Sequence, residues 1–329
     1  MFNNINGINN SSNSKPILNK KIFNSILRIV IGAGLLVFII IKVKPDEILA
    51  AVEDANLLFI FIACVLLVPN ILLQFWKWKI TCGIFLDDTG NKKILYSLFH
   101  GLAGGAFTPV RVGEYFGRAI EFKDKPFVKV SVATFVDKLF PLLILTFFGS
   151  LTSILFIRIY YFVSIYIILS LLIIVLALFI IVCLLLLNSN LWDNALFNFI
   201  KSKVKPDSVW VNLKMLKSVD KKYSAMMIVI SITFYICVLT QFAFLIAAFS
   251  HNMNFINYMW AGNLIMFAKS MIPSVTFADV GIREGASIFF LTKMGETSAA
   301  AFNASIFLFF INVLVPSLIG LLLLFKRSK

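Results

Sequence analysis

A short segment near residue 110 places charged side chains among glycines and apolar residues. It carries Arg111, Gly113, Glu114 and Arg118. A guanidinium group binds phosphate or carboxylate oxygens through two parallel hydrogen bonds, and a neighbouring carboxylate can hold it in position. Glu114 and Arg118 are four residues apart and would lie on one face of a helix. This segment therefore predicts either an anion-binding site or an ion pair that only fixes the local structure.

The residues around this segment indicate how it folds. The glycines of segment 101–105 permit a sharp reversal or a close approach of two backbone segments. Thr108 is a preferred helix N-cap and Pro109 a preferred first helical residue. We therefore expect a helix from Pro109 to about Ile120, with its free N–H groups beside Arg111 in an arrangement that suits a phosphate.

A second segment repeats this combination of charge and glycine near residue 280. It contains Asp279, Gly281, Arg283 and Glu284, and Lys269 precedes it in the same apolar stretch. An unpaired charge at the centre of a bilayer costs about 3 kcal/mol or much more, so such charges are usually paired or functional. The second segment therefore allows the same two interpretations as the first, a binding site or a structural ion pair.

Other polar residues within apolar stretches are candidates for supporting roles. Asp137 and Lys138 form a third charged pair that could partner the first segment. For Lys138 and Lys269 the alternative is that each long side chain reaches the membrane interface. Gln74, Trp76 and Trp78 are interpreted as parts of an interfacial anchor rather than of a site.

The composition indicates which elements must position these residues. Of the 329 residues 60% are hydrophobic, and the mean hydropathy is +0.93. A water-soluble domain could not cover so much apolar surface. The formal net charge of +14 would suggest a nucleic-acid partner in a soluble protein, but here most Lys and Arg lie in short segments between apolar runs. We therefore expect an all-α polytopic membrane protein with no nucleic-acid partner. The four cysteines form no CxxC motif, so neither a metal site nor a cofactor is expected.

Six apolar runs are long enough to cross roughly 30 Å of hydrocarbon as helices. Two further stretches, 94–110 and 255–292, are interrupted by Gly, Pro or charged residues, and we expect them to form broken helices or re-entrant helix–turn–helix hairpins. The six expected membrane-spanning helices are 23–41, 57–76, 131–157, 159–187, 224–249 and 299–325.

Positive charge distinguishes two topologies. If both broken stretches are re-entrant, the cytoplasmic segments hold 20 Lys and Arg and the outside segments hold 3. If both stretches cross the membrane once, the counts become 11 and 12. The positive-inside rule favours the first topology, which places both termini in the cytoplasm of a cytoplasmic (inner) membrane protein.

This topology contains an inverted repeat. Repeat one covers about 23–157 and repeat two about 159–325, and their hairpins enter the membrane from opposite faces. Broken hairpins at corresponding positions of two inverted repeats indicate a substrate site in transporters. Residues 1–22 are rich in Asn and Ser and are expected to form a disordered cytoplasmic tail, so residues 23–329 form a single transmembrane domain.

The two charged segments resemble the motifs of a known family. Segment 108–118 is similar to the "P-x-R-x-G-E…R" element of the lysylphosphatidylglycerol synthase transmembrane-region family, whose members are also called flippase-like membrane proteins. Segment 272–285 is similar to the later "P…G-x-x-G-x-R-E" element of that family. The resemblance covers nearly the whole chain after residue 22. Asp279 departs from the pattern, because that position is usually small and Gly-rich.

The resemblance implies a lipid-handling function. By their positions in the first motif, the resemblance implies that Arg111, Gly113, Glu114 and Arg118 bind the substrate. It implies the same role for Gly281, Arg283 and Glu284 of the second motif, beside Asp279. The family's membrane domain is linked to moving a lipid, such as aminoacylated phosphatidylglycerol, between leaflets. Because the chain ends shortly after its last expected span, we expect a stand-alone member without the aminoacyl-transferase domain.

The leading hypothesis is a lipid translocase. It would move an anionic or aminoacylated phospholipid, or a lipid-linked phosphate, and its partners would be membrane lipids bound through phosphate headgroups. One alternative is a secondary transporter for a small solute or ion, and another is a membrane partner of a separate lipid-modifying enzyme. A homo-oligomer is also compatible with the sequence. An enzyme is not expected, because His100 is the only plausible base near the motifs and no nucleophile accompanies it.

Overall fold

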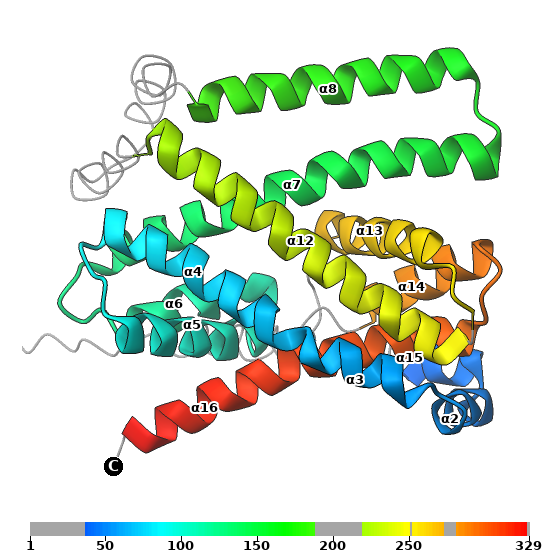
Figure 1. The fold of residues 1–329 in the computed structure, drawn as a ribbon, viewed down its shortest axis with the longest axis horizontal. Helices are drawn as coiled ribbons and strands as arrows, with labels where there is room; N and C mark the ends of the chain where they lie inside the picture. The colour runs from blue at the N-terminus through cyan, green and yellow to red at the C-terminus, as the bar shows by residue number, and fades with distance from the viewer. Residues whose placement is uncertain (1–36, 188–218, 251, 273–280, 328–329) are drawn as a thin grey trace, which may run out of the picture.

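The computed structural model describes residues 37–187, 219–250, 252–272 and 281–327 (Figure 1). Every regular element in these ranges is a helix, so the expected all-α class is confirmed. Five helical segments in these ranges are long and apolar enough to cross a membrane, and they match five of the six expected spans. The remaining expected span, 23–41, lies largely outside the described residues. The five segments are Leu57–Phe85, Phe127–Tyr161, Ile165–Leu184, Lys221–Ser250 and Ser298–Lys326.

Two of these long segments are interrupted. The first is divided into α3 (Leu57–Val65) and α4 (Leu67–Phe85). Pro69 lacks the N–H that would bond the carbonyl of Val65, which accounts for the break at Leu66. The last is divided into α15 (Ser298–Phe309), a π-helical turn η5 (Phe310–Leu314) and α16 (Val315–Arg327).

The other long helices are α7 (Phe127–Tyr161), α8 (Ile165–Leu187) and α12 (Lys221–Ser250). Helix α12 lies across the middle of the bundle, where it packs against α4, α7, α13 and α15 (Figure 1). Helix α8 packs mainly against α7, with Phe147 stacked on Phe179 at 3.8 Å. Most of its side chains are exposed and apolar, as expected for a helix that faces lipid.

The first broken stretch forms a helical hairpin. Helix α5 (Asn91–Ala106) runs to the middle of the bundle, and α6 (Gly113–Ala119) returns along it (Figure 1). Glycines bring the two helices together. A Cβ on Gly104 would lie 2.3 Å from the carbonyl oxygen of Gly113, and one on Gly117 would lie 2.1 Å from that of His100. Only glycine fits at these positions, because no real Cβ contacts an oxygen so closely.

The second broken stretch supplies a pair of short helices at the opposite half of the bundle. Helix α13 (Phe255–Met271) packs against α14 (Ile282–Lys293), and α14 lies beside α15. Residues 273–280, which connect them, lie outside the described residues. A short helix, α2 (Pro45–Glu53), lies at the same end of the molecule and packs on α15 (Figure 1).

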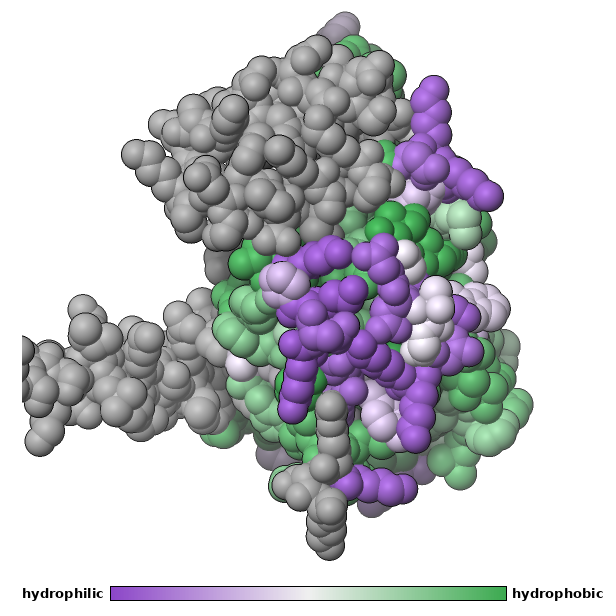
Figure 2. All heavy atoms as spheres, turned by 90° about the vertical axis from the view of Figure 1, so that its left-hand side faces the viewer, coloured by the Kyte–Doolittle hydropathy of each residue, from purple (hydrophilic) through white to green (hydrophobic). Residues whose placement is uncertain are grey.

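The bundle has two chemically different ends. The end where α4 leads to α5 and α6 leads to α7 shows a hydrophilic patch surrounded by apolar side chains (Figure 2). The described lysines in loops or terminal turns at this end are Lys92, Lys93, Lys123, Lys125, Lys129, Lys221, Lys222 and Lys326. The opposite end carries fewer basic residues, Lys42, Lys44, Arg158 and Lys293, together with Asp46, Glu47, Glu53, Asp54 and Glu296.

The apolar core consists of two main clusters. One lies between α12, α13 and α15 and includes Phe242, Tyr258 and Leu308. The other lies between α4, α5 and α7 and includes Trp78 and Phe140. Each cluster therefore packs one pair of short helices, α5 with α6 or α13 with α14, against the long helices.

The glycine contacts predict which substitution damages the first hairpin. We expect Gly117→Ala to lower the free energy of unfolding by about 1–3 kcal/mol, because its Cβ would force α6 away from the carbonyl of His100. Gly83→Ala in α4 is the matched control. Its Cβ would meet nothing closer than 4.0 Å, so it should be neutral or stabilising. Thermal unfolding of the purified protein in detergent measures both. Equal melting temperatures for the two variants would contradict the packing described here.

Candidate functional site

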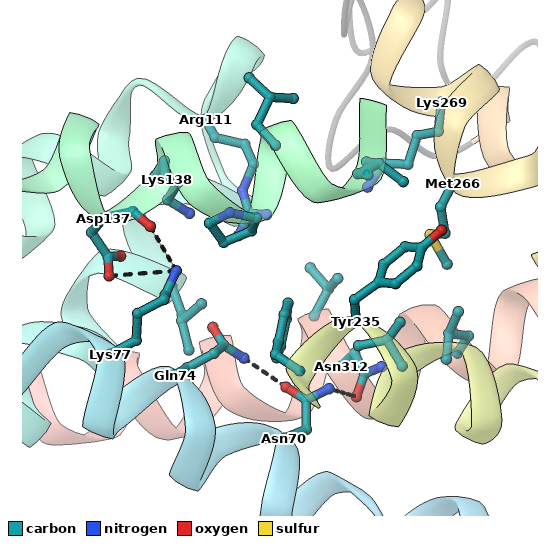
Figure 3. Close-up of a pocket in the computed structure, with 18 of the residues that line it drawn as sticks. Asn70, Gln74, Lys77, Arg111, Asp137, Lys138, Tyr235, Met266, Lys269 and Asn312 are labelled. Atoms are coloured by element: carbon teal, nitrogen blue, oxygen red, sulfur yellow. Dashed lines mark hydrogen bonds and ion pairs between the residues drawn. The ribbon is translucent and has the colours of Figure 1, made fainter. Parts of the chain in front are cut away.

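A cavity of about 350 Å³ lies at the middle of the bundle, between the two hairpins and the long helices (Figure 3). Its wall combines charged, amide and apolar side chains. The side chains of Arg111 and Lys138 are 42% and 37% exposed, so the cavity opens to the surroundings beside them. The lining residues are Asn70, Gln74, Lys77, Leu102, Arg111, Arg118, Asp137, Lys138, Pro141, Leu142, Leu145, Phe234, Tyr235, Val238, Leu239, Met266, Lys269, Arg283, Leu308, Asn312 and Val313.

Positive charge dominates this wall. Among the described residues that line the cavity, Asp137 is the only acidic one, whereas six are basic. The basic residues come from α4, η1 (Pro109–Arg111), α6, α7, α13 and α14. Both hairpins therefore contribute cations to one cavity. These six residues are Lys77, Arg111, Arg118, Lys138, Lys269 and Arg283.

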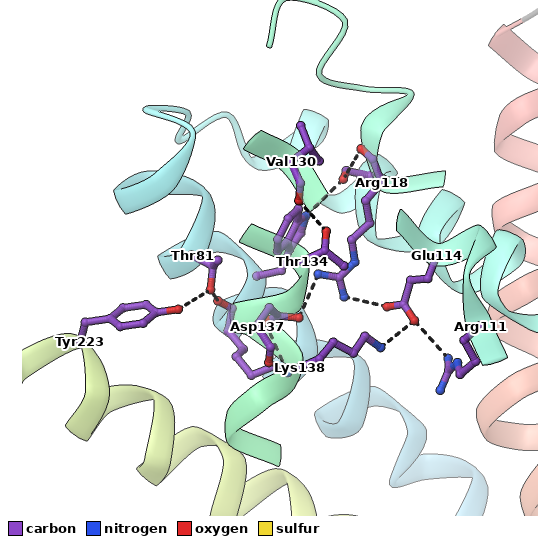
Figure 4. A network of polar contacts seen from close by, with 12 residues as sticks. Thr81, Arg111, Glu114, Arg118, Val130, Thr134, Asp137, Lys138 and Tyr223 are labelled. Atoms are coloured by element: carbon purple, nitrogen blue, oxygen red, sulfur yellow. Dashed lines mark hydrogen bonds and ion pairs between the residues drawn. The ribbon is translucent and has the colours of Figure 1, made fainter. Parts of the chain in front are cut away.

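Glu114 is the centre of the charged network on the first hairpin (Figure 4). One carboxylate oxygen accepts a hydrogen bond of 2.9 Å from Arg118. The other lies 2.6 Å from the ammonium of Lys138 and 3.6 Å from the guanidinium of Arg111. Glu114 itself is 1% exposed. A buried carboxylate thus joins three basic groups that come from different elements.

Asp137 extends this network to α4. It accepts a hydrogen bond of 2.9 Å from Arg118, while the ammonium of Lys77 lies 3.4 Å from its carboxylate. Lys77 also donates to the backbone carbonyl of Asp137 at 2.8 Å. Arg118 stacks over the ring of Trp78 at 4.2 Å, which adds a cation–π contact. The network therefore ties the first hairpin to both α4 and α7.

The turn before α6 has an unusual backbone. Val110 and Arg111 have φ values of 54° and 56°, which are rare for residues other than glycine. The expected helix from Pro109 is therefore wrong, because the regular helix begins at Gly113 after a 3₁₀ turn. Thr108 still caps it, since its hydroxyl accepts a hydrogen bond of 2.6 Å from the N–H of Gly113. Because the N–H of Gly113 is already hydrogen-bonded, it is not one of the free N–H groups that we expected a phosphate to contact.

The second hairpin carries a separate ion pair. Arg283 donates to Glu284 at 2.7 Å and to the hydroxyl of Ser305 at 3.0 Å. Glu284 also accepts the N–H of Gly281 at 2.6 Å, so it caps the start of α14. Gly281 has a φ of 94°, which favours glycine. Arg283 reaches the cavity, whereas the carboxylate of Glu284 holds it in place.

A chain of amide side chains crosses the cavity wall (Figure 3). Gln74 donates to Asn70 at 2.7 Å, and Asn70 donates to Asn312 at 3.4 Å. Asn312 donates to Gln241 at 2.6 Å, and Gln241 donates to the carbonyl of Ala63 at 2.7 Å. Asn312 lies in the π-helical turn η5, and such turns often occur at functional sites.

The structure brings together most of the residues that the sequence singled out. Arg111, Arg118, Asp137, Lys138, Lys269 and Arg283 line the cavity, and Glu114 and Glu284 pair with its basic groups. Gly113 and Gly281 start the two returning helices. Asp279 lies outside the described residues. The interpretation of Lys138 as a lysine that only reaches the interface is wrong, since it pairs with Glu114.

Sequence reasoning missed the contribution of α4. Gln74 lines the cavity and Trp78 is fully buried under Arg118, so the interpretation of both as an interfacial anchor is wrong. Asn70, Gln74 and Lys77 are spaced by four and three residues, which puts them on one face of a helix. This polar stripe in an apolar run was the available signal.

The charged network predicts a test by stability. We expect Asp137→Ala to lower the free energy of unfolding by about 3–5 kcal/mol, because Lys77 and Arg118 would keep their charges without this partner. Adding Lys77→Met should recover part of the loss, since it removes one of the two charges that lose this partner. Chemical or thermal unfolding of the single and double variants measures this coupling. A double variant no more stable than Asp137→Ala would contradict it.

The described residues contain no group of three His, Cys, Asp or Glu side chains that could hold a metal ion. No curated protein matches the chain by sequence. The model of the family described as "Lysylphosphatidylglycerol synthase TM region" matches residues 25–320, which is nearly the whole chain. It confirms the resemblance carried by the two charged segments. The chain is therefore a member of the lysylphosphatidylglycerol synthase TM region family.

Proposed function

We propose that this protein is a flippase-like lipid translocase that moves a phosphate-containing lipid between the two leaflets of a membrane. Family membership supports a membrane protein connected with lipid modification or translocation. The observation that carries the proposal is the central cavity, to which both hairpins contribute basic side chains. A phosphate headgroup would bind there through charge-assisted hydrogen bonds from Arg and Lys.

The cavity wall favours a lipid over a small solute. Many lining residues are apolar, among them Pro141, Leu142 and Leu145 of α7 and Phe234 and Val238 of α12. Leu142 is 48% exposed, so apolar surface continues from the cavity to the outside of the bundle. A headgroup could therefore occupy the polar wall while its acyl chains stay beside apolar side chains. A free ion or small polar solute would gain nothing from that apolar wall.

Each hairpin enters the membrane and returns to the same face in this proposal. Helix α6 has 7 residues and would span about 10 Å, too little to cross a bilayer. Helices α5 and α13 begin at opposite ends of the bundle and both end near its middle (Figure 1). With an additional span at 23–41, this arrangement gives six spans and two re-entrant hairpins in an inverted repeat. The inner ends of the hairpins then meet at a site near the midplane.

The lysine-rich end faces the cytoplasm of the inner membrane in this proposal. It carries eight described lysines, whereas the other end carries four described basic residues. Both chain termini would then lie in the cytoplasm. The protein moves its lipid without changing it covalently, because the charged groups of the cavity are arranged as ion pairs rather than as a nucleophile and its base.

Filling the cavity should stop transport without unfolding the protein. We expect Val238→Trp to reduce the exchange of a fluorescent phospholipid between leaflets at least tenfold, because the larger side chain would fill part of the cavity that the lipid must occupy. Val229→Trp on the same helix is the matched control, since Val229 is 63% exposed and does not line the cavity. Reconstituted vesicles and a membrane-impermeant quencher measure the exchange. Unchanged exchange in Val238→Trp at equal reconstitution would contradict the assignment.

Mass spectrometry of the lipid recovered from the vesicles with the unchanged protein should detect no covalent change in that lipid.

The topology predicts the accessibility of single cysteines. In a variant without the four native cysteines, Lys125→Cys should react with an impermeant thiol reagent only from the cytoplasmic side. Glu296→Cys should react only from the opposite side, because its loop lies at the other end of the bundle. Labelling of intact and permeabilised cells distinguishes the two sides. Labelling of both positions from one side would contradict the two-hairpin topology.

A further inference from the structure

The charged cluster around the first hairpin has more positive than negative groups. Lys77, Arg111, Arg118 and Lys138 share the carboxylates of Glu114 and Asp137 (Figure 4). Four formal positive charges against two negative charges leave a surplus of two. Glu114, Asp137 and Arg118 are at most 2% exposed, so water screens this surplus poorly.

The described residues of the second hairpin do not balance this surplus. Arg283 and Glu284 form a neutral pair, 4% and 0% exposed at their side chains. Lys269 of α13 lines the same cavity (Figure 3). Within the described residues, the cluster at the first hairpin therefore keeps two formal positive charges in excess. A ligand with two negative charges would neutralise them.

We propose that the cavity selects lipids whose headgroup ends in a phosphomonoester or diphosphate, with about two negative charges, over phosphodiester and aminoacylated lipids. This inference rests on the proposed transport function and narrows its substrate. A phosphodiester such as phosphatidylglycerol carries one negative charge and leaves half of the surplus uncompensated. A lysyl ester adds cationic groups to that phosphodiester, and these groups would face the same basic wall.

The cluster offers two kinds of basic group to such a headgroup. Arg118 is 3% exposed at its side chain and is held by both carboxylates, so it acts mainly as a fixed charge. Arg111 and Lys138 lie at the open part of the cavity, and among the described acidic residues both contact only Glu114. Arg111 is the more weakly held of the two, at 3.6 Å. These two side chains can turn from Glu114 toward a terminal phosphate, whose three free oxygens accept several donors.

Binding and exchange measurements on the full-length protein test this selectivity. Native mass spectrometry in detergent compares phosphatidic acid, phosphatidylglycerol and lysylphosphatidylglycerol with the same acyl chains. We expect phosphatidic acid to bind about tenfold more tightly than phosphatidylglycerol, with the lysyl lipid weakest. Equal or tighter binding of either competitor would overturn the proposal.

Variants that each lack one positive charge of the cluster provide a second test of the selectivity. Arg111→Gln and Lys138→Gln each remove one surplus charge, so each should bring the preference for phosphatidic acid over phosphatidylglycerol close to one. Lys293→Gln is the matched control, since this exposed lysine ends α14 away from the cavity and should leave the preference unchanged. A preference that survives in both cavity variants would overturn the assignment to this cluster.

Two further comparisons separate the source of the phosphate from the transport function. Glycerol 3-phosphate, the same headgroup without acyl chains, should compete at least a hundredfold more weakly than phosphatidic acid. Equal competition would overturn the lipid assignment. In vesicles, equal exchange of all three lipids would overturn the selectivity but not the transport function. Selective binding of phosphatidic acid without exchange of any lipid would overturn the transport function but not the selectivity.

Discussion

The buried bridge from Glu114 through Arg118 to Asp137 is the interaction on which the site depends. Within α6, Arg118 donates to Glu114 at 2.9 Å. Arg118 also joins α6 to α7 by donating to Asp137 at 2.9 Å, and Lys77 connects Asp137 to α4. The three central residues of the bridge are at most 2% exposed. Removing one partner of such a bridge leaves an uncompensated charge in an apolar surrounding, at a cost of about 3–5 kcal/mol. The position of the first hairpin is therefore fixed by electrostatics as much as by packing.

The glycines make this bridge possible. Helix α6 approaches α5 so closely that a methyl group at Gly104 or Gly117 would lie within 2.3 Å of a backbone oxygen. Small residues allow such close contact between helices in membranes, where no hydrophobic force drives helices together. The close contact buries Glu114 and Arg118 between the helices and keeps them from lipid. Backbone packing and charge pairing therefore require each other at this hairpin.

The sequence predicts the long elements better than the site. Runs such as 131–157 and 224–249 contain enough apolar residues to define a membrane helix without any tertiary information, and the structure has helices there. The charged segments were also visible, because Arg, Glu and Gly interrupt apolar runs. The contribution of Lys77 was not recognised, since its partner Asp137 is 60 residues away and only the fold brings them together. The expected start of α6 was also wrong, because the positive φ values of Val110 and Arg111 depend on tertiary contacts that no local propensity predicts.

The pairing of Arg111, Arg118 and Lys138 with Glu114 has a consequence for transport. A site made of unpaired cations would hold a phosphate so tightly that release would be slow. Here an entering phosphate must compete with Glu114 for Arg111 and Lys138, so the ion pairs offset part of the binding free energy. When the phosphate leaves, Glu114 pairs again with both cations, which lowers the free-energy cost of emptying the site. The carboxylates therefore keep the bound and empty cavities close in free energy, which is what a site that must both bind and release its lipid requires.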